Sequence, residues 1–470
     1  MKILLIYPPD THTIRTNVPP FVDQRIGVYP PLGLMYIAAA IMRWSDWEVE
    51  LLDCNAESIN YRDLKNEIKK RAPDVVGIQA ITFTLIDMIM TAKTVKEIDS
   101  RIPVVAGGPH VNIYPKETLL IPHIDYIILG EGEYAVCEFL KAMNGGKNIS
   151  EVQGIGYKSN EKLCINPRQG FIENLDGLPY PARKILKIER YYSLVSEYSP
   201  VTTLMSSRGC PFKCLYCDRP HLGKSFRARS AGNVVGEMIE CLSIGIKEIF
   251  FYDDTFTIDR KRVLEICDLI MERGISIAWD ARTHVDTVDE ALLNKMAEAG
   301  CRRIHFGVEA GTPQIQKVLR KNLDLDKVKN IFSAAKKAGL KTLAYFMIGC
   351  PTETAQQIEE TILFMLRLNA DYVHVSVATP YPHTDMYRLG LKQGLFKNDY
   401  WKEFAQNPKQ DFSPKLWTEN LSEEELLLTL KKAYKKFYLR PSYVLKDLLE
   451  LKSMNELKNK FSAGIKILFS

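Results

Sequence analysis

Short apolar runs alternate with amphipathic stretches along the first 145 residues. The apolar runs have the length of buried strands, and the stretches between them repeat apolar residues at the spacing of a helix face. Strands are predicted at 2–7, 47–53, 74–79, 103–106 and 124–129, and helices at 32–43, 61–71, 86–98 and 133–143. This alternation is typical of a parallel sheet with helices on both faces, so we expect an α/β domain over residues 1–145.

The alternation pauses and then returns. Residues 146–195 are less regular, contain a turn-rich stretch at 176–181, and are predicted to be a linker. Strands are then predicted at 201–206, 248–252, 276–280, 303–306, 342–347 and 372–377, with helices at 231–244, 260–273, 288–299, 324–338 and 355–368. Six such strands within residues 196–390 predict a parallel barrel, closed or partial, with its chemistry at the C-terminal strand ends. Residues 391–470, rich in Leu and Lys, are predicted to be helical.

Composition and charge narrow the class of protein. The 470 residues are 46% hydrophobic and 25% charged, as in an ordinary globular protein of two or three domains. A net charge of +5 is mild at this length, so we expect no nucleic-acid partner. The chain opens without a secretory signal pattern, and no run approaches the roughly 20 apolar residues of a membrane span. A cytoplasmic location is expected, and its cysteines should therefore be reduced.

Three of the ten cysteines form a dense group. Cys210, Cys214 and Cys217 have the spacing C-x3-C-x2-C, whereas the other seven are scattered. Soft thiolates select iron–sulfur clusters, zinc or copper, and a cluster with three thiolates leaves one iron open to bind a substrate. The alternatives are three buried thiols in a turn, or zinc, for which His221 is the best fourth ligand.

This spacing, with the aromatic Tyr216 just before the last cysteine, resembles the signature of the radical S-adenosylmethionine (SAM) superfamily. The resemblance implies that Cys210, Cys214 and Cys217 hold a [4Fe–4S] cluster as metal ligands and catalytic residues. It also implies that SAM binds the open iron, that Tyr216 lies over the adenine, and that one electron cleaves SAM to a 5′-deoxyadenosyl radical.

Further segments at the predicted strand ends resemble the family in the expected order. The resemblance assigns SAM-binding roles to Asp253 and Asp254 after the second strand, Arg282 after the third, Glu309 after the fourth and Gly349 after the fifth. The two aspartates could instead cap the following helix. Arg282 could pair with the methionine carboxylate, because arginine suits two-point recognition, or could be a surface residue.

The first domain carries its own candidate residues. Ligands of such sheets bind beyond the carboxyl ends of the strands, and Pro9, Thr82, Gly107, Gly108, Gly130 and Gly132 lie there together with Glu131. The segments Pro30–Leu34, Gly107–His110 and Gly130–Glu133 resemble the Rossmann-like cobalamin-binding domain that precedes many radical SAM barrels.

The D-x-H-x-x-G motif that supplies a cobalt ligand is missing, and His110 does not fit it. Cobalamin would therefore bind without histidine on that face, or the domain could serve as a scaffold that has lost cobalamin. The expected fold class is α/β: an N-terminal Rossmann-like doubly wound parallel sheet, a radical SAM (β/α)6 partial barrel, and a helical C-terminal region.

The end of the chain is basic. Residues 431–470 contain ten Lys and Arg against three Asp and Glu, and Lys431, Lys432, Lys435 and Lys436 share one helical face. Such a face either points to water while the helix packs on the barrel, which we favour, or rests on anionic lipid. The second alternative would make the protein membrane-associated and would favour a lipid-like substrate.

The resemblance implies methyl transfer to an unactivated carbon of a small-molecule or lipid-like substrate. One SAM would methylate cobalt, a second would give the radical, and an external donor such as flavodoxin or ferredoxin would supply electrons. A radical oxidative cyclase or rearrangement enzyme of the porphyrin-cyclase kind is the second hypothesis. A non-catalytic cobalamin or iron–sulfur binding protein is the third, and residue types do not name the substrate.

Overall fold

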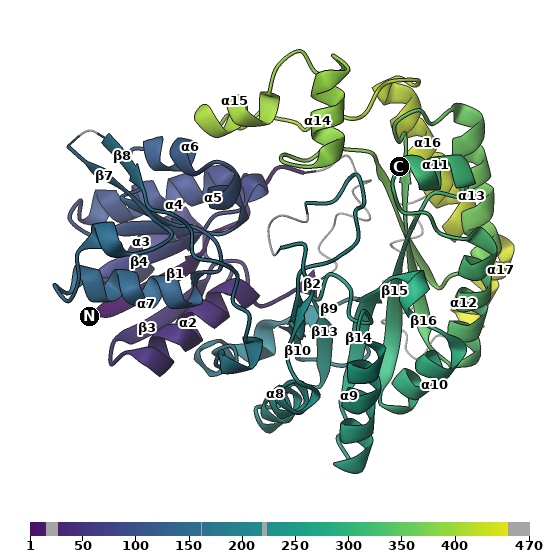
Figure 1. The fold of residues 1–470 in the computed structure, drawn as a ribbon, viewed down its shortest axis with the longest axis horizontal. Coiled ribbons are helices and arrows are strands. Elements are labelled where there is room, and N and C mark those ends of the chain that lie inside the picture. The colour runs from purple at the N-terminus through teal and green to yellow at the C-terminus, as the bar shows by residue number, and fades with distance from the viewer. Residues whose placement is uncertain (16–26, 161, 219–222, 450–470) are drawn as a thin grey trace.

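The computed structural model describes residues 1–15, 27–160, 162–218 and 223–449. Its front domain, purple and blue in Figure 1, contains a seven-stranded sheet in the order β3-β1-β4-β5-β6-β7-β8. The strands are β1 (Lys2–Tyr7), β3 (Glu48–Asp53), β4 (Val75–Gln79), β5 (Val104–Gly107), β6 (Tyr126–Ile128), β7 (Ile155–Ser159) and β8 (Lys162–Ile165). The first five are parallel, as the sequence predicts, and β7 and β8 continue the sheet as an antiparallel hairpin.

Helices cover both faces of this sheet. Side chains alternate across a strand, so Ile3 and Leu5 pack in one core while Leu4 and Ile6 pack in the other. Helices α2 (Leu32–Trp44) and α7 (Gly132–Met143) lie on the first face, and α3 (Tyr61–Arg71) and α4 (Leu85–Ile98) lie on the second. The predicted doubly wound architecture is confirmed. The hairpin also shows that residues predicted as linker contribute two strands to the front sheet.

The second sheet has six parallel strands in the order β10-β13-β14-β15-β16-β17. They are β10 (Val201–Leu204), β13 (Glu248–Phe251), β14 (Ala278–Thr283), β15 (Cys301–Glu309), β16 (Lys341–Ile348) and β17 (Tyr372–Val377). Among the described residues β10 does not pair with β17, so the predicted partial barrel is confirmed in its open form. Arg282, predicted to follow the third strand, lies within β14 instead, because that strand continues to Thr283. Glu309, predicted to follow the fourth strand, is the last residue of β15.

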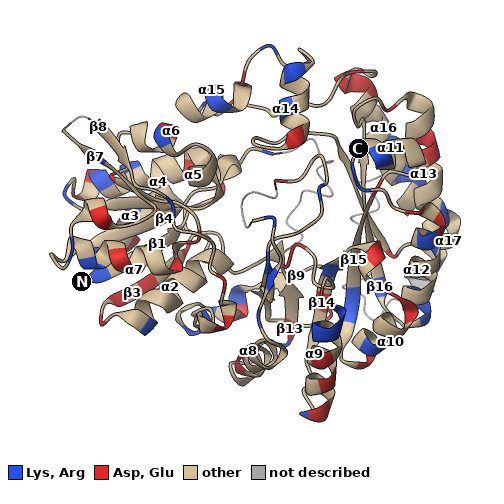
Figure 2. Cartoon of the chain, viewed as in Figure 1, with Lys and Arg blue, Asp and Glu red and all other residues tan. Residues whose placement is uncertain are grey.

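The outer face of the partial barrel carries helices along the connections. These are α8 (Ala231–Ser243), α9 (Arg260–Glu272), α10 (Glu290–Glu298), α11 (Pro313–Val318), α12 (Leu325–Lys337) and α13 (Ala355–Leu368). Basic and acidic residues are interspersed on outer helices such as α9 and α13 (Figure 2). Mixed charge of this kind is typical of a solvated surface.

The C-terminal region returns to both domains. It contains α14 (Asp385–Lys392), α15 (Tyr400–Gln406), α16 (Glu423–Tyr438) and α17 (Pro441–Leu449). Trp401 and Phe404 of α15 belong to the front-domain core, so this helix joins the barrel to the first domain (Figure 1). Helix α16 packs along β17, the last strand of the open sheet.

Helix α16 buries its aromatic side as the favoured interpretation predicts. Tyr434 and Phe437 are buried, whereas Lys431, Lys432 and Lys436 are exposed. In the part of the chain that the structure describes, no helix is both long and apolar enough to span a bilayer. The rest of the basic segment, residues 450–470, lies outside the described residues, and lipid contact through it stays a prediction.

Candidate functional site

A short hairpin closes the loop that carries the cysteine triplet. Strands β11 (Ser207–Arg208) and β12 (Arg227–Ala228) pair antiparallel, so both ends of the loop leave from one place. Gly209 adopts a left-handed φ of +82°, which glycine accepts without strain, and turns the chain into Cys210. The middle of the loop is anchored where Leu215 N donates to Leu319 O at 2.9 Å. His221, the alternative zinc ligand, lies outside the described residues.

The three thiols differ in exposure, since Cys214 is buried, Cys210 is half-buried and Cys217 is exposed. Desolvation by the surrounding protein raises the pKa of Cys210. It also raises the pKa of the otherwise exposed Cys217, where the nearby Cys214 and Asp254 add to the effect. Among the described residues, no three His, Cys, Asp or Glu side chains converge closely enough to hold a single metal ion. A [4Fe–4S] cluster binds each thiolate at a different iron, and its charge offsets the cost of ionising these thiols. The donor set therefore fits the cluster that the family implies.

The two aspartates after β13 have different surroundings. Asp253 is fully buried, and it accepts hydrogen bonds from Ser206 N at 2.7 Å and from the Ser206 and Ser207 hydroxyls. Its carboxylate therefore anchors the entry to the loop. Asp254 is exposed and accepts a hydrogen bond from Gly209. Of the pair, Asp254 has the carboxylate better placed to meet a cofactor.

Tyr216 and Glu309 meet although they are 93 positions apart in the sequence. The Tyr216 hydroxyl donates to the Glu309 carboxylate, and Lys321 Nζ lies 3.8 Å from Glu309 Oε1. Burial raises the pKa of Glu309, against the opposing effects of Lys321 and Tyr216. A Cβ at Gly307 would stand 2.5 Å from Glu309 Oε1, so a larger residue there would displace this carboxylate from its observed position. The structure thus brings two of the predicted SAM-binding residues together.

Arg282 and Gly349 complete the predicted residues of the barrel. The guanidinium of Arg282 lies 4.4 Å from the centre of the Tyr252 ring, and its side chain remains exposed. Gly349 has a φ of +71°, and a Cβ there would meet Leu426 of α16 at 2.6 Å. Gly349 therefore allows α16 to approach the loop after β16.

A polar face inside the open sheet was not predicted. His305 Nδ1 lies 3.0 Å from the Tyr345 hydroxyl, and His305 Nε2 lies 3.1 Å from Asp280. His374 packs against the Tyr345 ring at 5.7 Å. Residues 304 and 306 pack outward with the helices, so the alternation of polar and apolar residues in β15 and β17 was the available signal.

The predicted residues of the front domain gather at the carboxyl edge of its sheet. Pro9 follows β1, Gly107 ends β5, and Thr82 begins a 3₁₀ turn after β4. The Thr82 hydroxyl lies 3.0 Å from His110 Nδ1, whereas the buried His110 Nε2 has no partner in the described residues. A Cβ at Gly107 would be in ordinary van der Waals contact, 3.9 Å from Ile128 O, so glycine is not required there by its neighbours. The unsatisfied His110 nitrogen fits a polar group of a bound cofactor at this edge.

Other glycines at this edge are required by packing. Gly108 has a φ of +125°, and a Cβ there would lie 2.7 Å from Ala80 O. Gly130 has a φ of +79°, and a Cβ at Gly132 would meet Ile37 at 2.9 Å. The side chain of Glu131, which stands between Gly130 and Gly132, is 4% exposed and accepts hydrogen bonds from Arg208 and Arg227 at the two ends of the cysteine loop. The predicted corrin edge therefore touches the predicted cluster loop.

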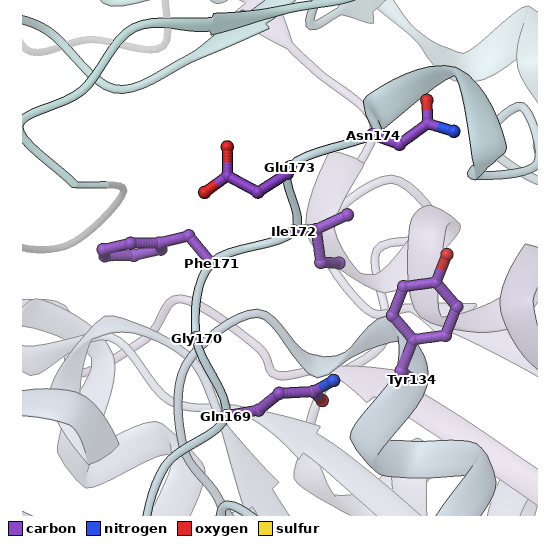
Figure 3. A pocket seen from close by; sticks show the side chains of 7 residues that line it. All are labelled: Tyr134, Gln169, Gly170, Phe171, Ile172, Glu173 and Asn174. Carbon is purple, nitrogen blue, oxygen red and sulfur yellow. The ribbon is translucent and has the colours of Figure 1, made fainter.

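A separate pocket of about 350 Å³ lies between Tyr134 of α7 and residues 169–174 (Figure 3). The Tyr134 ring stacks on Trp44 with their centres 4.7 Å apart. None of the predicted cofactor-binding residues lines this pocket.

Comparison with known proteins identifies both domains. Residues 204–365 match the Radical SAM superfamily, and residues 20–140 match the B12 binding domain. A Pyrococcus horikoshii protein named as an uncharacterized methyltransferase is 35% identical, over 96% of this chain and 95% of that protein. The anaerobic magnesium-protoporphyrin IX monomethyl ester cyclase of Rubrivivax gelatinosus is 27% identical, over 94% of this chain and 78% of its own.

A solved structure has the same fold. The cobalamin-dependent SAM radical enzyme OxsB, with aqua-cobalamin and SAM bound, has a TM-score of 0.73 at 16% identity, over 99% of this chain and 72% of its own. The two family matches follow one another in the order predicted from the sequence, and the Pyrococcus relative spans both. The chain therefore belongs to the cobalamin-dependent radical SAM methyltransferase family.

Proposed function

We propose that the protein transfers a methyl group to an unactivated carbon of a small-molecule substrate. The observation that carries this proposal is the contact between Glu131 and the arginines of the cysteine loop. It joins the front-domain edge that we propose for the corrin ring to the loop that we propose for the cluster. When bound, the cluster and SAM supply the hydrogen-abstracting radical, and cobalamin supplies the methyl group.

The side chains bind and orient these groups. Cys210, Cys214 and Cys217 hold the cluster, and Tyr216 and Glu309 bind the adenosine part of SAM. Gly107, beside Thr82 and Pro9, receives the corrin ring. Arg282 and Asp254 take the carboxylate and amine of the methionyl part.

The substrate would lie inside the open sheet. His305, Tyr345 and His374 offer polar groups there. We propose that flavodoxin or ferredoxin delivers electrons from the side of the exposed Cys217. A cytoplasmic location would supply such donors and would keep the thiols reduced.

The test is product counting under anaerobic conditions. The reconstituted enzyme receives SAM with a deuterated methyl group, a reductant, and small-molecule extracts as the substrate source. Methyl transfer yields S-adenosylhomocysteine and 5′-deoxyadenosine in equal amounts, with the label in a new product. The Cys210→Ala variant is the control and yields no 5′-deoxyadenosine.

A radical cyclase is the second candidate, because the Rubrivivax cyclase matches nearly the whole chain. A cyclase would form 5′-deoxyadenosine with little S-adenosylhomocysteine and would leave no label in the product. That result would overturn the proposal of methyl transfer.

A further inference from the structure

A buried ion-pair cluster joins the cysteine loop to the front domain. Arg208 Nη1 lies 2.8 Å from Glu131 Oε1, and Arg227 Nη1 lies 2.9 Å from Glu131 Oε2. A second nitrogen of Arg208 donates to Glu133. The four side chains are between 4% and 6% exposed, and their two positive and two negative charges balance.

Other groups contact the ion-pair cluster. The backbone N–H of Ile172 donates to Glu131 Oε2 at 2.6 Å, and Ile172 O accepts from Arg227. The Arg208 guanidinium also lies 5.2 Å from the ring centre of Tyr36 on α2. Burial opposes ionisation of Glu131, but Arg227 and Arg208 outweigh it and hold its pKa below the usual value.

The position of this ion-pair cluster matters more than the stability that it contributes. Arg208 stands two residues before Cys210, and Arg227 pairs with Arg208 across the hairpin that closes the loop. Glu131 lies in the turn between Gly130 and Gly132, which is predicted to face the corrin ring. The Glu131 carboxylate thus holds both ends of the cysteine loop against the front-domain edge where cobalamin is predicted to bind.

We propose that Glu131 is a positioning residue that sets how the cluster loop stands relative to bound cobalamin, acting through Arg208 and Arg227. The inference rests on the proposed function, because it needs cobalamin in the front domain. Glu131 touches neither the substrate nor the reacting atoms. Its carboxylate holds the two cofactor-binding elements at the separation that methyl transfer requires.

The experiment uses the full-length, reconstituted holoenzyme and Glu131→Gln, which keeps the shape and removes the charge. Reduced [4Fe–4S] clusters and cob(II)alamin are both paramagnetic, so electron paramagnetic resonance measures their magnetic interaction. We expect Glu131→Gln to bind both cofactors, to show an altered interaction, and to form at least about tenfold less methylated product per 5′-deoxyadenosine. An altered interaction is not expected from a loss of stability alone.

Lys187→Met is the matched control. Lys187 pairs with Glu57 on the exposed part of the same domain boundary, away from the cysteine loop. This variant should keep the wild-type interaction and product ratio. If Glu131→Gln does not fold, Arg208→Lys replaces it, since lysine keeps the charge but cannot hold Glu131 and Glu133 together.

The outcomes separate the two proposals. An unchanged magnetic interaction and product ratio in Glu131→Gln, with a methylating wild type, would overturn the role of Glu131 alone. A wild type that binds cobalamin but does not methylate would overturn the proposed function, and the magnetic interaction would still decide the positioning role. A wild type that binds no cobalamin would overturn both.

Discussion

Tyr434→Phe tests how helix α16 satisfies the backbone hydrogen bonds of β17, the last strand of the open sheet. The Tyr434 hydroxyl accepts a hydrogen bond from Val375 N at 2.9 Å and donates one to Val375 O at 3.0 Å. Helix α16 therefore satisfies a backbone N–H and a C=O of β17. Tyr434 is fully buried, and no water replaces its hydroxyl when the residue becomes Phe. Leaving a buried donor and acceptor unsatisfied costs about 2–4 kcal/mol together.

The measurement is hydrogen exchange at the Val375 amide in the anaerobic protein. A cost of about 2–4 kcal/mol predicts exchange about 30- to 1,000-fold faster, if local opening governs exchange. Tyr438→Phe is the control, because Tyr438 makes the same pair of bonds to Val373 from a half-buried position where water can enter. Exchange within about threefold of wild type in Tyr434→Phe, or equal effects of both substitutions at their own sites, would refute this account of the edge.

The remaining predictions concern the cysteine loop, the SAM site and Glu353, a buried residue between β16 and α13. Cys210→Ala should abolish both the cluster absorbance and the reductive cleavage of SAM, and retained cleavage would reject the assignment of the loop. Glu309→Gln should weaken SAM binding by at least about tenfold in equilibrium binding, since it removes a charged acceptor, and unchanged affinity would remove Glu309 from the SAM site. Burial raises the pKa of Glu353 to about 7. Wild type therefore loses stability relative to Glu353→Gln as pH rises from about 4.5 to about 7, by up to about 3 kcal/mol. Denaturation at pH values on both sides of this range checks the sign, and a difference that does not vary with pH would contradict it.

The sequence predicted the elements better than the contacts between them. The five parallel strands of the front sheet and the six of the barrel follow from local apolar runs, and the cysteine loop follows from its spacing. The extents of several strands were missed. Strand β14 reaches Thr283, β15 runs from Cys301 to Glu309, and the front sheet continues into β7 and β8. Strand ends depend on neighbouring strands, which periodicity along one segment does not contain.

Glu131 shows why long-range roles escape a reading of the sequence. It was predicted as a cofactor-binding residue because it lies between two glycines at a strand end. Its observed partners Arg208 and Arg227 are 77 and 96 positions away, and no local pattern links them. The role of the turn itself in binding cobalamin stays a prediction.

The open sheet bears on where the substrate binds and on its polarity. A closed parallel barrel fills its interior with layers of side chains and has no room there for a ligand. Here β10 and β17 do not pair in the described residues, and α16 covers β17 from outside. On β13, the strand next to β10, Phe250 packs against Tyr29 with the two ring centres 5.2 Å apart. The interior keeps a polar face around His305 and Tyr345, which favours a substrate that carries polar groups into the barrel.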